Sequence, residues 1–463
     1  SFSRDSSGSD IADQSRIVIL YTNDEHGWME PTESTGGAAG LLGLLEEVEG
    51  LSANGPYLIL SGGDMWTGPA ISTWFEGESM VEVMNVMGYR AAAIGNHEFD
   101  FTLDSLKARM AQSDFPLLSA NIRLRADGSI PDYITPYVIK TVNDVRVGLI
   151  GLTTTSAYTS TAPVNVVDLD FIDYSQALSE YVPQAIAAGG ELIIVVGHIC
   201  EYEMRALAAT AAALGVHILT GGHCNDLVAA EVDGVIILEG GSHLQTYARA
   251  DIQFDRETGS ILSAKLGTFE NTGGTPDMGV TAVIAPWREA LDAVLSDEIG
   301  YTGNGINRYS QEMRNMVTDS WLWAFPAADI ALTNAGGIRQ SINQGSITKE
   351  TIVGLLPFVN DILKLELTGE QITTSYGSLI GGGIIRLNGY FHMDGSPIVA
   401  DSVYSILTID YLYSRPDYNF QFDDPDPIVM GVNYRQPVMD WIDSLDTTPA
   451  DPLENYLDYT RRQ

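Results

Sequence analysis

Five short clusters of polar residues in the first half of the chain carry side chains that can bind metal ions or transfer protons. Any one of them has a structural explanation at least as good as a chemical one, but five together predict a metal centre. Carboxylate, amide and imidazole groups in this mixture suit Zn²⁺, Mn²⁺, Fe²⁺ or a similar divalent ion. The clusters are Asp24-Glu25-His26, Gly63-Asp64, Gly95-Asn96-His97-Glu98-Phe99-Asp100, Gly197-His198 and Gly222-His223-Cys224-Asn225.

Each cluster directly follows a short apolar run that predicts a buried strand. Hydrophobic strands that alternate with amphipathic helices indicate an α/β layered domain, in which functional groups lie on loops at the carboxyl ends of strands. Asp24 and His26 are two residues apart, so in an extended segment both point the same way and can share one ion. The expected strands are 17–21, 57–60, 91–94, 117–119, 145–150, 192–196, 217–219 and 235–238, and the expected helices are 41–48, 80–87, 103–110, 174–188 and 203–214.

The second half of the chain predicts a connector and a further α/β segment. A helical stretch at 281–296 leads into a Gly/Asn-rich turn at 300–307, and strands are expected near 330–333, 362–366 and 403–409. The acidic, Pro-rich stretch 422–427 predicts a surface loop. At the other end, residues 1–15 are rich in Ser, Asp and Gly and predict a disordered leader without an apolar targeting segment. No apolar run reaches the roughly 18 residues that a membrane span needs.

The charge of the chain excludes several classes of partner. It has 61 Asp and Glu against 24 Lys and Arg, for a formal net charge of −37. Such a polyanion is repelled by nucleic-acid phosphates and anionic lipid, which argues against a nucleic-acid polymer or a membrane surface as partner. A hydrophobic content of 45% supplies ample material for packed cores. An anionic substrate would need a local positive centre, and metal ions are the first candidate.

The motifs together resemble the 5′-nucleotidase family of the calcineurin-like metallophosphoesterase superfamily, in the two-domain form of bacterial periplasmic nucleotidases and animal ecto-5′-nucleotidases. The matching segments are TNDEHG (22–27), GGDMWTG (62–68), GNHEFD (95–100), SANI (119–122), GHICEYEM (197–204), GGHCN (221–225), NAGGIR (334–339) and LPF (356–358). The resemblance implies a catalytic β-sandwich flanked by helices (αββα) over 16–276. It also implies a linker helix over 277–302 and a smaller C-terminal α/β substrate-binding domain over 303–463.

The resemblance also assigns two sets of metal ligands. One divalent ion would be held by Asp24, His26, Asp64 and Asn225, and the other by Asp64, Asn96, His198 and His223, with Asp64 bridging. Many relatives have His or Gln at the position of Asn225, whereas animal ecto-5′-nucleotidases have Asn. An amide oxygen is the weaker donor, so we expect this ion to be lost more readily. The identity of the two ions, Zn, Mn or similar, is left open.

Two further residues of GNHEFD are expected to be catalytic. In the resembled mechanism a metal-bridging hydroxide attacks phosphorus in line, and the ions offset the charge that develops. His97 would stabilise the transition state or protonate the leaving oxygen. Asp100, three residues on, would orient the imidazole of His97 and favour its protonated form.

The substrate contacts are expected in the C-terminal domain. Arg339 is the candidate phosphate anchor, Phe358 and Tyr411 match two rings that sandwich a base, and Asp417 matches an acid that binds ribose hydroxyls. The set comprises Asn334, Gly336, Gly337, Arg339, Phe358, Tyr411, Asp417 and Arg314.

Two departures from the family bear on the substrate. Arg415-Pro416 precedes Asp417 where the family has two glycines, so this loop cannot take the same backbone path. A phosphate-binding arginine of the family falls near Arg308 or Tyr309, and Arg314 could substitute for it.

The sequence therefore predicts a metal-dependent phosphoric ester hydrolase. The favoured activity is that of a nucleotide-binding enzyme of nucleotide catabolism, which converts nucleoside 5′-monophosphates to nucleoside and phosphate. The altered Arg415-Pro416 loop keeps open an enzyme for 2′,3′-cyclic nucleotides, nucleotide sugars or non-nucleotide monoesters, and a non-catalytic nucleotide- or metal-binding module is a third hypothesis. We expect an extracytoplasmic protein, periplasmic, secreted or lipid-tethered, whose signal segment is absent from this chain. We expect a small phosphoester as the partner and no transmembrane segment in the chain. The oligomeric state is left open.

Two cysteines and three histidines lie outside the assigned set. Cys200 and Cys224 stand beside metal-ligating histidines on converging loops, so a disulfide is possible, but two free buried thiols are the favoured interpretation. His217, His243 and His392 match no motif, and packing or surface hydrogen bonding is expected for them.

Overall fold

A computed structural model describes residues 14–463. The expected leader, residues 1–15, falls outside the described residues except for Gln14 and Ser15, which already belong to the first strand. Contacts divide the chain into two compact units: residues up to 67 with 76–161 and 165–287, and residues 68–75 with 162–164 and 288–463. The division falls inside helix α8 (Met278–Leu295), which lies within the expected linker of 277–302.

The first unit contains two six-stranded sheets. In one sheet β1 (Gln14–Thr22), β2 (Tyr57–Ser61), β3 (Ala91–Ala93) and β4 (Leu117–Leu118) run parallel, and β13 (Thr246–Asp255) and β14 (Ser260–Glu270) extend it antiparallel beyond β1. In the other, β7 (Val145–Leu152), β9 (Leu192–Gly197), β10 (Ile218–Thr220) and β12 (Val235–Gly240) run parallel, with β6 (Tyr137–Val142) and β11 (Leu227–Val232) antiparallel at the edges. All eight strands expected here are present.

The two sheets pack face to face around one apolar core. Side chains of β1 such as Ile17 and Ile19 meet side chains of β9 such as Leu192 and Ile194 in this core, and all four are fully buried. All six residues of β9 are buried, which is typical of a parallel strand covered on both faces.

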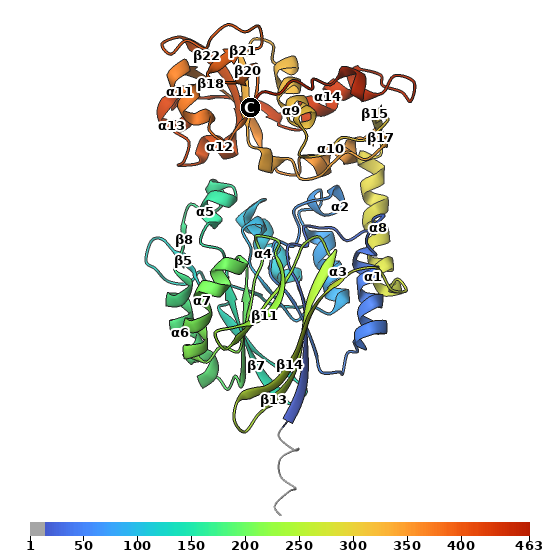
Figure 1. Ribbon diagram of the computed structural model, residues 1–463, viewed down its shortest axis with the longest axis vertical. Helices are drawn as coiled ribbons and strands as arrows, with labels where there is room; N and C mark the ends of the chain where they lie inside the picture. The colour runs from blue at the N-terminus through green and yellow to red at the C-terminus, as the bar shows by residue number, and fades with distance from the viewer. Residues whose placement is uncertain (1–13) are drawn as a thin grey trace, which may run out of the picture. The chain divides into compact units, whose positions relative to one another are not determined.

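Helices cover the outer faces of the two sheets. Helices α6 (Tyr174–Ala187) and α7 (Glu201–Leu214) pack on the second sheet through a second apolar cluster. Figure 1 shows them on one side of the sheets and α1 (Gly37–Leu44) and α3 (Glu78–Met87) on the other. This is the expected helix-flanked β-sandwich. The first unit also contains α4 (Leu103–Gln112), α5 (Ala157–Ser160), β5 (Ile122–Leu124) and β8 (Leu169–Phe171), whereas α2 (Ala70–Thr73) is grouped with the second unit.

The second unit is a smaller α/β domain, as expected. Its five-stranded sheet has the order β19 (Ile380–Gly382), β16 (Ile330–Thr333), β22 (Val403–Ile409), β18 (Asp361–Thr368) and β23 (Ile428–Asn433). Two small antiparallel sheets pair β15 (Glu298–Thr302) with β17 (Gly345–Thr348) and β20 (Ile384–Arg386) with β21 (Tyr390–His392). The helices are α9 (Gln311–Ala324), α10 (Lys349–Leu355), α11 (Gly369–Tyr376), α12 (Asp410–Ser414), α13 (Phe420–Asp423) and α14 (Gln436–Ser444).

One expected turn is partly a strand. Gly300 lies within β15, where the pairing with β17 shifts register between Glu298 and Gly300, so a glycine-containing stretch still forms ladder hydrogen bonds. Within residues 14–463, no helix has the length and apolar character needed to cross a membrane.

Candidate active site

The predicted ligands lie on loops at the carboxyl ends of parallel strands from both sheets. Asp24 and His26 follow β1, Asp64 follows β2 and Asn96 follows β3, while His198 and His223 follow β9 and β10. Five of the predicted ligands have positive φ angles, which non-glycine residues rarely adopt. They are Asp24 (49°), His26 (47°), Asp64 (57°), His223 (74°) and Asn225 (60°). Such conformations cost about 1–3 kcal/mol each and persist at functional sites because the surroundings enforce them.

Backbone hydrogen bonds enforce the conformation of the first two loops. The N–H of Asp24 donates to the carbonyl of Gly63, and the N–H of His26 donates to the carbonyl of Asp64, both at 2.9 Å. The Asn23 amide also holds the Asp24 carboxylate, because its Nδ2 donates to Asp24 Oδ2 at 2.7 Å and to the Gly241 carbonyl at 2.7 Å. The loops after β1 and β2 are therefore joined along their length.

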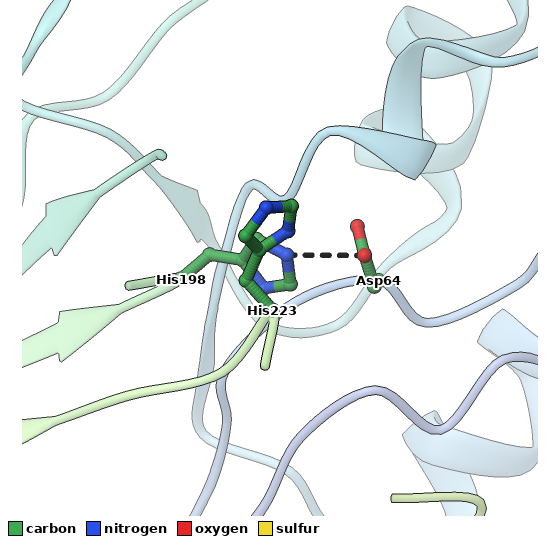
Figure 2. Close-up of side chains that lie close together, drawn as sticks. All are labelled: Asp64, His198 and His223. Atoms are coloured by element: carbon green, nitrogen blue, oxygen red, sulfur yellow. Dashed lines mark ion pairs between the residues drawn. The ribbon is translucent and has the colours of Figure 1, made fainter. Parts of the chain in front are cut away.

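The side chains form two clusters that share one carboxylate. Asp64, His198 and His223 form one and Asp24, His26 and Asp64 the other, and within each cluster the ligand atoms lie within 4.8 Å of one another. Asp64 Oδ2 is 3.0 Å from His198 Nε2 and 4.0 Å from His26 Nε2. Figure 2 shows the Asp64 carboxylate pointing at His198, with His223 beside it.

The other oxygen of each carboxylate is occupied by the protein itself. Asp64 Oδ1 accepts the N–H of His97 at 2.8 Å, and Asp24 Oδ2 accepts the N–H of His223 at 2.9 Å. Asp24 Oδ1 instead lies 3.6 Å from His26 Nε2. One oxygen of each carboxylate is thus fixed and the other faces the imidazoles.

The imidazoles are oriented by backbone carbonyls. A carbonyl only accepts, so His26 Nδ1 must donate to Thr67 O at 2.9 Å and His198 Nδ1 to Gly62 O at 2.6 Å. Metal-binding histidines almost always donate their second ring nitrogen in this way. His223 Nε2 lies 3.2 Å from Ser156 Oγ, which leaves Nδ1 for a ligand. This donor set fits divalent metal ions.

Asn96 lies beside the cluster of Asp64, His198 and His223. Its Oδ1 lies 3.2 Å from His198 Nε2 and its Nδ2 donates to the carbonyl of Ser160 at 2.9 Å, so the amide oxygen faces the site. Asn225 follows His223 by two residues and its side chain is exposed.

Electrostatics show that the cluster demands positive charge. Burial alone would lower the pKa of His198, yet Asp64 and Asp24 raise it to about 10. Burial alone would raise the pKa of Asp64, yet the charges of His198 and His97 hold it well below its usual range. Burial and the charge of His198 lower the pKa of His223 to about 4. The proton on His198 thus supplies part of the positive charge that a divalent ion would supply.

His97 and Asp100 form the expected pair. His97 Nδ1 lies 2.7 Å from Asp100 Oδ2, and Thr161 Oγ1 donates to Asp100 Oδ1 at 3.0 Å. The rings of His97 and His26 are 5.3 Å apart. A carboxylate on Nδ1 fixes the tautomer, so Nε2 is the nitrogen that would exchange a proton with a substrate.

Sequence reasoning assigned no role to two buried glutamates beneath these loops. Glu98 accepts backbone N–H groups of Asp64, Met65 and Gly95 at 2.6–2.8 Å, and burial raises its pKa to about 7. Glu25 accepts from Thr22 Oγ1 and Ser61 Oγ, and burial raises its pKa to about 8. Both glutamates occur inside the quoted motifs but are not among the assigned ligands. A charged residue in a motif without an assigned role was therefore the sequence signal that could have identified them.

The favoured interpretation of the cysteines was wrong. Cys200 and Cys224 form a disulfide with Cα atoms 5.1 Å apart. The physical reason is that the two loops converge on the Asp64–His198–His223 cluster, which brings the cysteines within the usual disulfide range of about 4.4–6.8 Å.

Two of the three unassigned histidines have the expected structural contacts. His217 accepts the N–H of Ile193 at 3.0 Å and donates to the Gly259 carbonyl at 2.9 Å, and the ring of His392 packs 5.3 Å from that of Tyr404. His243 also packs, but beside the site: its ring is 5.2 Å from that of Trp28 and 5.7 Å from that of His26. No motif marked this position.

In the second unit, the predicted phosphate anchor has an aromatic and a cationic neighbour. The Arg339 guanidinium lies 5.7 Å from the centroid of the Phe358 ring. Arg308 donates to the Arg339 carbonyl, and burial together with the charge of Arg339 lowers the pKa of Arg308. Arg314 lies on α9 with its Nε buried. Arg308 therefore lies next to Arg339, the predicted phosphate anchor.

The glycines of NAGGIR lie against Asn334. A Cβ at Gly336 would lie 3.3 Å from Asn334 Nδ2, and one at Gly337 would lie 3.7 Å from Asn334 Oδ1. Asn334 Oδ1 is buried and has no hydrogen-bond partner within residues 14–463.

Arg415 organises the other predicted substrate contacts. Its guanidinium binds both carboxylate oxygens of Asp417, donates to the Tyr411 hydroxyl at 2.7 Å and lies 5.4 Å from the Tyr411 ring centroid. The pairing of Phe358 with Tyr411 around a base stays a prediction.

Comparisons with known proteins agree with this fold. Residues 297–375 match the family model described as 5′-nucleotidase, C-terminal domain. A snake venom 5′-nucleotidase of Gloydius brevicauda is 28% identical over 413 residues, covering 78% of this chain and 69% of that protein. Endonuclease YhcR of Bacillus subtilis is 24% identical over 459 residues, covering 88% of this chain but only 38% of that protein. The crystal structure of a 5′-nucleotidase precursor from Thermus thermophilus matches in fold with a TM-score of 0.82 at 21% identity, covering 94% of this chain and 97% of that one.

The chain has two compact units and two Asp/His clusters suited to metal ions, and its fold matches that of the Thermus thermophilus protein. In sequence it resembles the 5′-nucleotidases over most of its length, as its motifs indicated. These similarities support a hydrolase that acts on phosphate esters.

Proposed function

We propose that the chain is a dimetal phosphohydrolase that converts nucleoside 5′-monophosphates to nucleoside and phosphate. The observation that carries this proposal is the sharing of Asp64 by two ligand clusters, with the His97–Asp100 pair next to them. The names of the relatives support the substrate class.

We assign ligands to the two ions from the donor atoms and from the resemblance to the family. One ion would be held by Asp24, His26, Asp64 and Asn225, and the other by Asp64, Asn96, His198 and His223. When bound, two such ions lower the pKa of water and polarise phosphoryl oxygens.

The chain supplies the remaining steps with its own side chains. His97 is held by Asp100 with Nε2 available to donate a proton to the leaving oxygen or to hydrogen-bond the developing charge. Its backbone N–H anchors Asp64, so the proton donor and the shared ligand keep a constant separation. In the second unit Arg339 would bind the phosphate, and Asn334, Phe358 and Tyr411 would position the nucleoside.

One observation favours a second candidate substrate class. Asp417, the predicted acceptor of ribose hydroxyls, already accepts two hydrogen bonds from Arg415, whose guanidinium also lies against Tyr411. Because Asp417 is occupied by Arg415, it is less available to ribose hydroxyls, which suits a 2′,3′-cyclic nucleotide, whose hydroxyls are esterified. The guanidinium also suits a substrate with a second phosphoryl group, such as a nucleotide sugar.

A hydrolysis panel tests the proposal. Protein reconstituted with Mn²⁺, Zn²⁺ or Co²⁺ would be assayed against AMP, 2′,3′-cyclic AMP, UDP-glucose and p-nitrophenyl phosphate. Preference for AMP supports the nucleotidase, preference for the cyclic nucleotide or the nucleotide sugar supports the second candidate, and no hydrolysis of any ester overturns both.

The disulfide also supports an extracytoplasmic location, because disulfides persist mainly in oxidising compartments. Labelling free thiols in the native protein from its host would test this: a fully oxidised pair is expected, and reduced cysteines would contradict it.

A further inference from the structure

The disulfide joins the two loops that supply the histidines of one cluster. Cys200 follows His198 by two residues, and Cys224 comes directly after His223. Cys224 also stands directly before Asn225. The bond therefore ends inside the segment 222–225, from which each of the two proposed ions would take one ligand.

The two loops are held to very different degrees. His198 is fully buried, its N–H donates to the Leu152 carbonyl at 2.8 Å, and its ring is fixed by Gly62. Cys200 is 2% exposed and its N–H donates to Glu203 at the start of α7 at 2.9 Å. This side of the disulfide is anchored in the body of the first unit.

The loop that carries His223 reaches the surface. His223 is half-buried, and Cys224 and Asn225 are exposed. His223 and Asn225 both have positive φ angles, and the N–H of His223 donates to Asp24, which is itself a proposed ligand. Two residues in a rarely populated conformation on an exposed loop require an external constraint.

We propose that the Cys200–Cys224 disulfide is a positioning element of the metal centre, which ties the exposed loop 222–225 to the buried start of α7 and thereby sets the affinity for the ions. A cross-link reduces the conformations open to this loop, so less entropy is lost when its ligands are ordered around an ion. This proposal rests on the metal centre of the proposed function.

The test removes the disulfide and measures metal binding directly. The chain has only two cysteines, so Cys200→Ser/Cys224→Ser removes one bond and nothing else of its kind. Calorimetric titration of the metal-free proteins with Mn²⁺ should show at least one ion bound about 10–100-fold more weakly, the range found when groups that support metal ligands are lost.

A matched control separates positioning from general stability. Ile252→Val trims a fully buried side chain of β13 and should lower the thermal unfolding temperature without touching the loop. We expect its Mn²⁺ affinity to stay within twofold of the original protein. An equal loss of affinity in this control would overturn the positioning role.

A double-mutant cycle identifies the ligand through which the bond acts. In a His223→Ala background, removal of the disulfide should cost less affinity than in the original protein, because the constrained ligand is already gone. Unchanged Mn²⁺ affinity in the cysteine variant, full additivity with His223→Ala, or free thiols in the original protein would each overturn the proposal. If the original protein bound no Mn²⁺ at all, the metal centre and the proposed function would fail instead.

Discussion

The Nδ1 atom of His97 lies 2.7 Å from Oδ2 of Asp100, and the backbone N–H of the same histidine holds Oδ1 of Asp64 at 2.8 Å. His97 thus has two roles in the proposed site. Its backbone N–H holds the shared ligand Asp64, and its side chain is the proposed proton donor to the substrate.

The first prediction separates these two functions of His97. His97→Ala keeps the backbone N–H, so it should retain both ions yet lose about 10²–10⁴-fold in kcat, as expected for loss of general acid catalysis. Steady-state kinetics with metal content measured by mass spectrometry checks this. Metal content that falls in step with activity would contradict the assigned role.

The second prediction concerns Asp100. Asp100→Asn keeps an oxygen that can accept from His97 Nδ1 but removes the charge that favours a protonated imidazole, so kcat should fall less than in His97→Ala. In the double variant with His97→Ala, the asparagine should add almost no further loss, because it acts only through that imidazole. Additive losses would show that Asp100 has a separate role.

The third prediction uses the shared position of Asp64. Asp64→Asn should weaken both ions, whereas Asp24→Asn should weaken mainly one, because only Asp64 belongs to both clusters. Mn²⁺ titrations of the two metal-free variants provide the comparison. Equal patterns in the two variants would exclude a bridging role for Asp64.

The fourth prediction follows from the proton on His198. Its pKa of about 10 in the metal-free protein means that the imidazole is protonated at pH 7 and must lose this proton to bind an ion. Metal affinity should therefore rise with pH between 7 and 9, with release of about one proton per ion at this site. Calorimetry in buffers of different ionisation enthalpy counts the protons, and no release would contradict the assignment.

The fifth prediction concerns the stability of the second unit. Burial raises the pKa of Asp410 to about 6, above its ordinary value of 3.8. The folded state therefore binds this proton more readily than the unfolded state, and the stability it contributes is fully present below pH 3.8 and lost as the pH rises through 6. Asp410→Asn should raise the free energy of unfolding at pH 8, on the order of 2 kcal/mol.

Thermal unfolding of both proteins across this pH range checks the fifth prediction. The difference between them should shrink as the pH falls through 6 toward 3.8, because the aspartate of the original protein is then neutral in the folded state and increasingly neutral in the unfolded state. A constant difference at every pH would show that the substitution acts through packing rather than through charge.

Much of the first unit could be predicted because its strands and ligands are adjacent in sequence. Strands such as Leu192–Gly197 are continuous apolar runs, and His198 follows directly, so the strand positions the ligand without help from distant segments. The antiparallel strands β13 and β14 were not predicted. Along β13 buried and partly buried positions alternate, and its role depends on pairing with β1 more than 200 residues earlier.

The features that escaped prediction depend on distances across the fold. Convergence of the two loops was expected, but whether their cysteines bond depends on the separation of their Cα atoms, 5.1 Å, which no local pattern encodes. His243 lies beside His26 because its N–H donates to the Asp24 carbonyl, a contact between the loop after β12 and the loop after β1. In the second unit, contacts such as that of Arg415 with Tyr411 come from a loop that departs from the family, so resemblance could not supply its geometry.

A single carboxylate oxygen of Asp64 faces both His26 and His198, so occupancy of the two proposed metal positions would be thermodynamically linked. The first ion to arrive draws electron density from the oxygen that the second must use, so the second binds with a different free energy. By reciprocity each ion alters the affinity of the other by the same factor. A change at one proposed metal position would then alter the metal concentration that the other requires.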